Sequence, residues 1–429
     1  MKNAKVSKDV KRKNILDRLF ASYSGPAFAI QTWDGWFWIS SQNQSPSFTV
    51  VFRTQRALGH LFFDPNEWTL GKAFITGDLE VEGDLIAAFH LAEHVFQQPA
   101  TLQYRLLQTL GAIAFSVREF VYSGRKHSPS RDGMAIAYHY DQPSEFYLPW
   151  LGPSLVYSCA YFHHENDSLD VAQSNKLDYI CRKLRLKPGE RFLDIGCGWG
   201  SLILHAACRY QAIACGITLS QWQAKTAAGR INRANLQERC GVELRDYRTL
   251  VDAPEFFDKI TSVGMFEHVG RKLLPAYFQI AHSILRPGGV FLNHGIARSY
   301  KQQTRKLSFM DRYVFPDGEL VPIAEALEAA ERAGFEVRDV ENLREHYAKT
   351  LRLWVRGLQE HKEQALGHVS QTTYRIWKLY MAGSAAAFER GDLGIYQTVL
   401  SRPDHGRSYM PLTRKDWYTS QACEIGVSV

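Results

Sequence analysis

Side chains that can hold or move a proton occur in three short stretches that border predicted strands. Cys159 lies in "YSCAYF", Glu267 in "SVGMFEHVG" and His294 in "FLNHGI". The carboxyl ends of parallel strands meet at one edge of an open α/β sheet, where such sheets bind ligands. We therefore expect Glu267 and His294 to converge there, beside the cysteine segment. Neither residue belongs to an HxxxH or HExxH spacing, so no metal is predicted at this edge.

A glycine-rich loop precedes these stretches in "FLDIGCGWGSL", where an apolar strand is expected to turn into a helix. Glycines let a ligand approach the backbone closely, and a helix N-terminus favours electronegative groups. The D-x-G-x-G spacing resembles the loop of class I S-adenosylmethionine (SAM) methyltransferases. That resemblance implies SAM contacts at Asp194, Gly196 and Gly198. A tight turn without a ligand is the alternative.

The next two predicted strand ends carry polar residues that suit a nucleoside. The first, "ITLSQWQ", lacks the acid that many methyltransferases place at the ribose, so Thr218, Ser220, Gln221 and Gln223 could supply neutral hydrogen bonds instead. Of this stretch, Thr218, Leu219 and Gln223 are expected to contact the cofactor. At the second, Asp246 is expected to accept from the adenine amino group and Tyr247 to pack on its ring. Each residue taken singly also suits a helix cap or a polar surface position.

The elements around these motifs alternate between strand and helix from about residue 134 onward. Such alternation predicts an α/β fold with helices on both faces of a parallel or mixed sheet. Together with the glycine loop it indicates a Rossmann-like class I SAM methyltransferase with a seven-stranded mixed sheet and a smaller N-terminal α+β domain. The seven strands are expected at 191–197, 213–219, 241–247, 258–265, 289–296, 335–343 and 394–401. The expected domains are a basic flexible tail (1–16), an N-terminal domain (17–125), a linker (123–133) and a catalytic domain (134–429).

Charge and cysteine content indicate where the protein works. The net charge is +7, of which the first 13 residues carry +5. This tail suits an anionic surface, either a membrane leaflet or nucleic acid, with a solvated tail as the alternative. No basic groove with interleaved aromatics is evident after residue 13, which argues against nucleic acid. Seven cysteines without a CxxC pair, no long apolar run and no signal peptide favour a cytoplasmic protein peripheral to the membrane.

Several longer segments resemble the cyclopropane-fatty-acyl-phospholipid synthase family, which includes the mycolic acid cyclopropane synthases. They are "RALGHLFFDPNEWTLGKAFITGDLEVEGDL", "HYDQPSEFYLPWLGPSLVYSCAYF", "LDIGCGWG", "VGMFEHVG", "YVFPDGEL" and "HYAKTLRLW". The resemblance implies that Tyr157 and Ser158 contact SAM. It also implies a catalytic bicarbonate ion held by Cys159, Glu267, His294, the backbone of Ile296, and Tyr347. The N-terminal domain would bind lipid or form a homodimer.

The family's chemistry implies methylene transfer from SAM to the cis double bond of a phospholipid acyl chain, which yields a cyclopropane. Aromatic faces would stabilise the intermediate carbocation, and bicarbonate would remove its proton. Nothing basic beside Cys159 would lower its pKa, so we expect that residue to anchor the ion and not to attack as a thiolate. The alternatives are a methyl-branched, methylene or hydroxymethyl product, N-methylation of a small amine, and a lipid-binding protein without activity.

Overall fold

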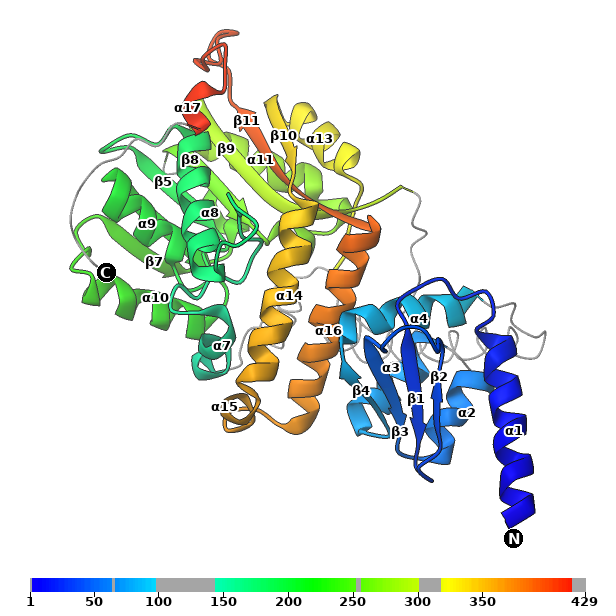
Figure 1. The fold of residues 1–429 in the computed structure, drawn as a ribbon. Coiled ribbons are helices and arrows are strands. Elements are labelled where there is room, and N and C mark those ends of the chain that lie inside the picture. The colour runs from blue at the N-terminus through cyan, green and yellow to red at the C-terminus, as the bar shows by residue number, and fades with distance from the viewer. Residues whose placement is uncertain (1, 64–65, 98–142, 252–255, 301–317, 419–429) are drawn as a thin grey trace, which may run out of the picture. The chain divides into compact units, whose positions relative to one another are not determined.

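The computed structural model describes residues 2–63, 66–97, 143–251, 256–300 and 318–418 (Figure 1). These residues form two compact units. The N-terminal unit contains the described residues up to 97 together with 369–386, and the sheet unit contains the other described residues from 143 onward. Within the described ranges, no helix has both the length and the apolar character needed to cross a bilayer. The predicted linker 123–133 lies outside the described residues.

The sheet unit is built on one seven-stranded mixed sheet, as the sequence predicts. The strand order is β10-β11-β9-β8-β5-β6-β7, in which β11 pairs antiparallel with β9 and β10 and all other pairs are parallel. All seven predicted strands are present: β5 (Arg191–Ile195), β6 (Ile213–Thr218), β7 (Cys240–Leu244), β8 (Phe257–Val263), β9 (Leu285–Arg298), β10 (Glu336–Asn342) and β11 (Leu393–Ser401).

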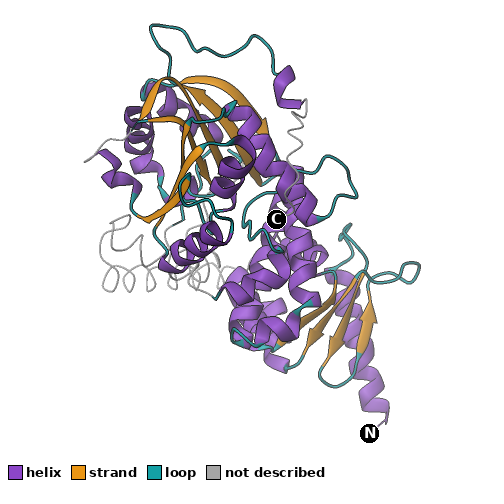
Figure 2. Cartoon of the chain, turned by 90° about the vertical axis from the view of Figure 1, so that its left-hand side faces the viewer, coloured by secondary structure: helices purple, strands orange, loops and turns teal. Residues whose placement is uncertain are grey.

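Helices cover both faces of this sheet, because neighbouring residues of its central strands are apolar on both sides. Phe192 and Leu193 of β5 are both fully buried, but they belong to two different cores. One core includes α11 (Leu274–Ile284) and α13 (Ile323–Arg332), and the other includes α8 (Leu169–Leu184) and α9 (Ser201–Tyr210). Figure 2 shows the helices beside the strands. The remaining helices are α7 (Ser144–Leu151), α10 (Gln221–Arg233), α14 (Arg344–Glu360), α15 (Lys362–Leu366) and α17 (Lys415–Tyr418).

The N-terminal unit is a small α+β structure, as predicted. Its four-stranded sheet has the order β2-β1-β3-β4, formed by β1 (Phe28–Thr32), β2 (Phe37–Ile39), β3 (Phe48–Phe52) and β4 (Leu79–Gly83). Its helices include α1 (Lys2–Leu19), α2 (Gln55–Phe63), α3 (Glu67–Thr76) and α4 (Leu85–Gln97). Phe28 and Phe48 stack in its core with ring centroids 5.6 Å apart, and Trp38 packs edge-on against Phe28.

Two features of this unit differ from the sequence-based expectation. Residues 1–16, expected to be a flexible tail, fall within α1 from Lys2 onward, because the helix buries Leu16 and its Asp17 accepts a hydrogen bond from the Trp38 indole at 2.9 Å. The segment 369–386 of α16 (Gln371–Arg390), expected in the catalytic domain, belongs to the N-terminal unit. There Arg375 donates to the Phe74 carbonyl at 2.7 Å and pairs with Glu80.

Candidate active site

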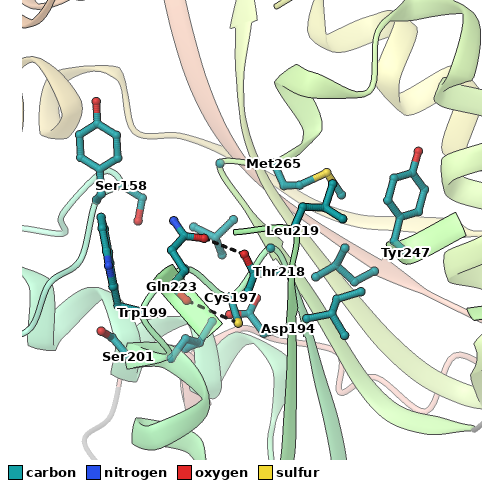
Figure 3. A pocket seen from close by; sticks show the side chains of 18 of the residues that line it. Ser158, Asp194, Cys197, Trp199, Ser201, Thr218, Leu219, Gln223, Tyr247 and Met265 are labelled. Carbon is teal, nitrogen blue, oxygen red and sulfur yellow. Dashed lines mark hydrogen bonds between the residues drawn. The ribbon is translucent and has the colours of Figure 1, made fainter. Parts of the chain in front are cut away.

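A pocket lies at the carboxyl ends of β5, β6 and β8, at the edge where the sequence places the site (Figure 3). The glycine loop after β5, the turn after β6 and the segment before α8 contribute to its wall. Nine of the ten predicted cofactor residues line it: Tyr157, Ser158, Asp194, Gly196, Gly198, Thr218, Leu219, Gln223 and Tyr247. The sheet topology therefore brings together residues from four separate parts of the chain.

Two glycines leave room for a ligand against the backbone of this pocket. Gly198 and Gly264 have φ angles of +55° and +67°, a conformation that favours glycine, and a Cβ at either position would meet no atom within 4 Å. Both residues line the pocket, and α9 begins at Ser201 immediately after the loop. This open backbone suits a ligand of the SAM type, which presses against the loop at a helix N-terminus.

The polar groups of the pocket are largely satisfied by one another. Thr218 donates to Gln223 Oε1 at 2.7 Å, and Thr261 donates to Asp194 Oδ1 at 2.7 Å. Burial raises the pKa of Asp194 to about 6. Asp246, the tenth predicted residue, is not on the pocket wall, because its two oxygens accept from the guanidinium of Arg248. Its contact with adenine stays a prediction.

Glu267 lies in the short helix η2 (Phe266–His268) that follows β8. Strand β8 pairs with β9 only as far as Val263, which lies opposite His294. The backbone N–H of Ile296 lies beyond this pairing and donates to Glu267 Oε1 at 2.7 Å. The other oxygen, Oε2, is buried with no hydrogen-bond partner among the described residues. Burial raises the pKa of this carboxyl to about 7, so it can gain or lose a proton near neutral pH.

His294 is fully buried on β9, two residues before Ile296, so both side chains point to the same face of the strand. Burial, with Lys176 and Lys183 adding to the effect, lowers its pKa well below the usual range, so the ring is neutral. Gln397 Nε2 lies 3.3 Å from Nδ1, and an amide nitrogen can only donate. With the Gln397 amide in this orientation, Nδ1 is the acceptor and the proton is on Nε2; neither Nε2 nor Gln397 Oε1 has a partner in the described part of the chain.

Gln397 is a site residue that the sequence reasoning missed. It lies in "YQTVL" on β11, directly opposite His294 in the antiparallel pair with β9, and it is fully buried. A glutamine between apolar strand residues is a signal of a buried polar contact. Its partner is identified only by the register of two strands about a hundred residues apart.

Cys159 lies in the loop before α8, and Tyr347 lies in the first turn of α14. The Cys159 thiol donates to the Ala160 carbonyl at 3.3 Å, and burial raises its pKa far above the usual range. Tyr347 is buried and packs edge-on against Trp354, on which Tyr157 also stacks at 5.0 Å between centroids. The predicted site thus adjoins a cluster of aromatic rings, and the thiol is protonated.

None of the five residues predicted to hold hydrogencarbonate is on the pocket wall, so the pocket is a cavity for SAM alone and the ion stays a prediction. The open glycine backbone and the hydrogen-bonding edge suit SAM. The unpartnered Nε2–H of His294 and the unpartnered Oε2 of Glu267 are a buried donor and a buried acceptor, a combination that suits hydrogencarbonate, which both accepts and donates. The Ile296 N–H, also predicted to bind that ion, already donates to Glu267.

Comparison with known proteins gives consistent matches. The profile of the family described as mycolic acid cyclopropane synthetase matches residues 127–398. The chain is 39% identical over 399 residues to "Probable fatty acid methyltransferase" of Pseudomonas putida, covering 91% of this chain and 95% of that protein. It is 38% identical over 269 residues to the cyclopropane-fatty-acyl-phospholipid synthase of Escherichia coli (strain K12), covering 62% and 66%.

The chain also matches solved structures. The structure of mycolic acid cyclopropane synthase CmaA1 complexed with SAH and CTAB aligns with a TM-score of 0.59 and 33% sequence identity. The alignment covers 62% of this chain and 97% of the other. The match is thus to nearly the whole of that protein and to part of this one.

Proposed function

The chain belongs to the mycolic acid cyclopropane synthetase family, and from that premise we propose that it transfers a methylene group from SAM to the cis double bond of a phospholipid acyl chain. The observation that carries the proposal is the buried pair of unpartnered groups, His294 Nε2–H and Glu267 Oε2, beside a SAM-type pocket. Ring closure after methyl transfer requires a proton acceptor, and the buried Glu267 carboxyl can act as one.

The reaction makes and breaks a defined set of bonds. SAM would supply a methyl group electrophilic enough for an isolated alkene to attack. A carbon–carbon bond forms, the carbon–sulfur bond breaks, and S-adenosylhomocysteine leaves. The positive charge then lies on the acyl chain. Loss of one proton from the new methyl group lets the ring close.

Two groups of side chains would act on that charge. The rings of Tyr157, Tyr347 and Trp354 present electron-rich faces that stabilise a cation at close range. Glu267 accepts the proton, since a carboxyl with a pKa of about 7 is ionised in a useful fraction of molecules at neutral pH. A bound hydrogencarbonate would supply a base between the substrate and Glu267, held by His294 Nε2–H. Cys159, protonated and buried, lines this site without attacking.

The N-terminal unit supports a lipid substrate at a membrane surface. Helix α1 carries the basic residues of the sequence start, and Trp33 and Phe37 are 40% and 51% exposed. The Arg12 guanidinium lies 5.8 Å from the Trp33 ring. Exposed aromatic rings beside basic groups suit the interface of an anionic bilayer. We propose that this unit holds the enzyme at a membrane surface. A homodimer stays a prediction of the family resemblance.

A second product is favoured by one observation. The relative that matches over 91% of this chain is called a fatty acid methyltransferase, whereas the match to the E. coli cyclopropane synthase covers 62%. An enzyme that generates the same cation but lets water add to it, instead of removing a methyl proton, would leave a methyl branch beside a hydroxyl group and release one proton. Both products require SAM and the same acyl substrate.

Lipid mass spectrometry separates these possibilities. The chain is expressed in a host that has unsaturated phospholipids and no enzyme of this family, with SAM labelled as CD3. A cyclopropane retains two deuterium atoms, and a methyl branch retains three. Fatty acids that gain no labelled carbon would contradict the proposed function. A labelled product in which the methyl group keeps all three deuterium atoms would contradict ring formation.

A further inference from the structure

Helix α14 binds the segment that follows Cys159 through two side-chain acceptors. The backbone N–H of Ala160 donates to Thr350 Oγ1 at 3.1 Å, and the backbone N–H of Phe162 donates to His346 Nδ1 at 3.0 Å. Thr350 is fully buried and donates its own hydroxyl hydrogen to the His346 carbonyl at 2.7 Å. Because His346 and Thr350 are one helical turn apart, they lie on the same face of α14. We call them the α14 acceptors.

Helix α8 binds the same segment at different backbone groups. The N–H of Tyr161, between the two N–H groups that α14 accepts, donates to the Ala172 carbonyl of α8 at 3.0 Å. Farther upstream, the Gln173 amide of α8 donates to the Ser158 carbonyl at 2.9 Å. The residues predicted to contact SAM are therefore held by α8, whereas the α14 acceptors bind only the part of the segment after Cys159.

The α14 acceptors lie next to two residues that the family resemblance implies at the hydrogencarbonate. Cys159 immediately precedes the first N–H that α14 accepts, and its sulfur lies 3.8 Å from the Leu343 carbonyl oxygen at the start of that helix. Tyr347 directly follows His346. A shift of the segment along α14 therefore changes the distance between Cys159 and Tyr347, while α8 still holds Ser158.

The His346 ring is oriented by a second contact. It lies nearly parallel to the Tyr161 ring, with 4.8 Å between the centroids and 8° between the planes. Burial lowers the pKa of His346, so Nδ1 is unprotonated at neutral pH and can accept from Phe162. Resting on the proposed function, we infer that His346 and Thr350 are positioning residues, which hold Cys159 and Tyr347 at the separation that hydrogencarbonate requires.

Alkylation of Cys159 by iodoacetamide, read by peptide mass spectrometry, tests this inference without depending on activity. Thr350→Val removes the hydroxyl and Thr350→Ser keeps it, whereas His346→Phe keeps the ring and His346→Asn keeps an acceptor near the position of Nδ1. Cys181 is also fully buried and reports global unfolding, so the ratio of the Cys159 rate to the Cys181 rate is compared. We expect this ratio to rise about 10-fold in Thr350→Val and His346→Phe, because a buried N–H loses its acceptor. It should change by less than about 3-fold in Thr350→Ser and His346→Asn.

Product formation at varied hydrogencarbonate is the second measurement. In Thr350→Val and His346→Phe, the concentration for half-maximal activity should rise about 10-fold, with SAM affinity by calorimetry within about 3-fold of wild type. Thr350→Ser and His346→Asn should restore it. An alkylation ratio that stays at the wild-type value in Thr350→Val, or an equal loss of SAM affinity, would overturn the inference. If Thr350→Val does not fold, His346→Phe decides by the same criteria. A wild type that forms no labelled lipid would instead contradict the proposed function, and the alkylation ratio would still decide whether the α14 acceptors hold the segment.

Discussion

In the cofactor pocket Thr218 donates to Gln223 and Thr261 donates to Asp194, whereas His294 Nε2 and Glu267 Oε2 are buried without hydrogen-bond partners among the residues that the structure describes. The first region satisfies most of its polar groups internally. The second is buried as deeply and leaves a donor and an acceptor unpaired, which costs stability. Unpaired buried polar groups in a native protein commonly mark a functional site. The contrast suggests that SAM binding and proton removal depend on separate sets of residues.

Glu267→Gln should separate the two regions most clearly. The amide keeps an oxygen that can accept from the Ile296 N–H, but it cannot take up a proton. We expect a loss of about 10²- to 10⁴-fold in product formation, the usual contribution of a positioned base. SAM affinity, measured by calorimetry, should stay within about 3-fold of wild type. A comparable loss of both would make Glu267 part of the cofactor pocket and remove the distinction between the regions.

The same variant also tests the burial of Glu267 through stability. The folded pKa of about 7 lies above the ordinary value of 4.5, so the folded state favours the protonated acid. The stability that this group contributes is complete below pH 4.5 and declines as the pH rises through 7. Relative to Glu267→Gln, wild type should therefore lose stability from pH 5 to pH 7, by at most about 1.4 kcal/mol per pH unit. The unfolding free energies of both proteins are measured with denaturant at each pH. If their difference stays constant from pH 5 to pH 7, the carboxyl is not desolvated.

Gln397 should influence the proposed hydrogencarbonate site at Glu267 and His294, called the anion site below, through the tautomer of His294, with an effect of intermediate size. In Gln397→Met the hydrogen bond to Nδ1 is lost and Nε2 no longer has a fixed proton. We expect the bicarbonate concentration for half-maximal activity to rise about 10-fold, which corresponds to the free energy of about one hydrogen bond. Excess bicarbonate should restore the rate, and SAM affinity should not change.

Gln397→Glu provides the opposite case at the same position. An ionised carboxylate there can only accept, so it would draw the His294 proton to Nδ1 and turn Nε2 into an acceptor. Added bicarbonate should then fail to restore activity. If the two variants respond to bicarbonate alike, Gln397 supports packing alone and does not set the tautomer.

The two regions also differ in how far the sequence reveals them. All seven strands were predicted because apolar runs alternate with amphipathic segments, and the glycine loop identifies its own ligand class within eleven residues. Seven of the nine predicted cofactor residues that line the pocket lie at or shortly after the ends of β5, β6 and β7, whereas Tyr157 and Ser158 were named from the family resemblance. Asp246 does not line the pocket, because Arg248, two residues later, donates to its carboxylate. Sequence spacing does not show whether the carboxylate binds a ligand or a neighbouring arginine.

The anion site depends on contacts between distant segments, which sequence patterns do not encode. Glu267 and His294 were expected to converge because both follow predicted strand ends, but Ile296 and Tyr347 were named only from the family resemblance, and Gln397 was not named at all. Gln397 can be assigned to His294 only from the register of β9 and β11. The helical state of α1 and the packing of 369–386 with the N-terminal unit were missed because both depend on tertiary contacts that override local composition.

Cys159→Ser should have the smallest effect and decides what the thiol contributes to the anion site. Burial holds the pKa of Cys159 far above neutral, so the thiolate population is negligible and the group can only donate or fill space. Serine keeps a donor toward the Ala160 carbonyl and is slightly smaller. We expect activity within about 10-fold of wild type and unchanged SAM affinity, since neighbouring Tyr157 and Ser158 carry the cofactor contacts. Loss of activity as complete as in Glu267→Gln, with normal folding, would instead require sulfur chemistry that a buried, protonated thiol does not provide.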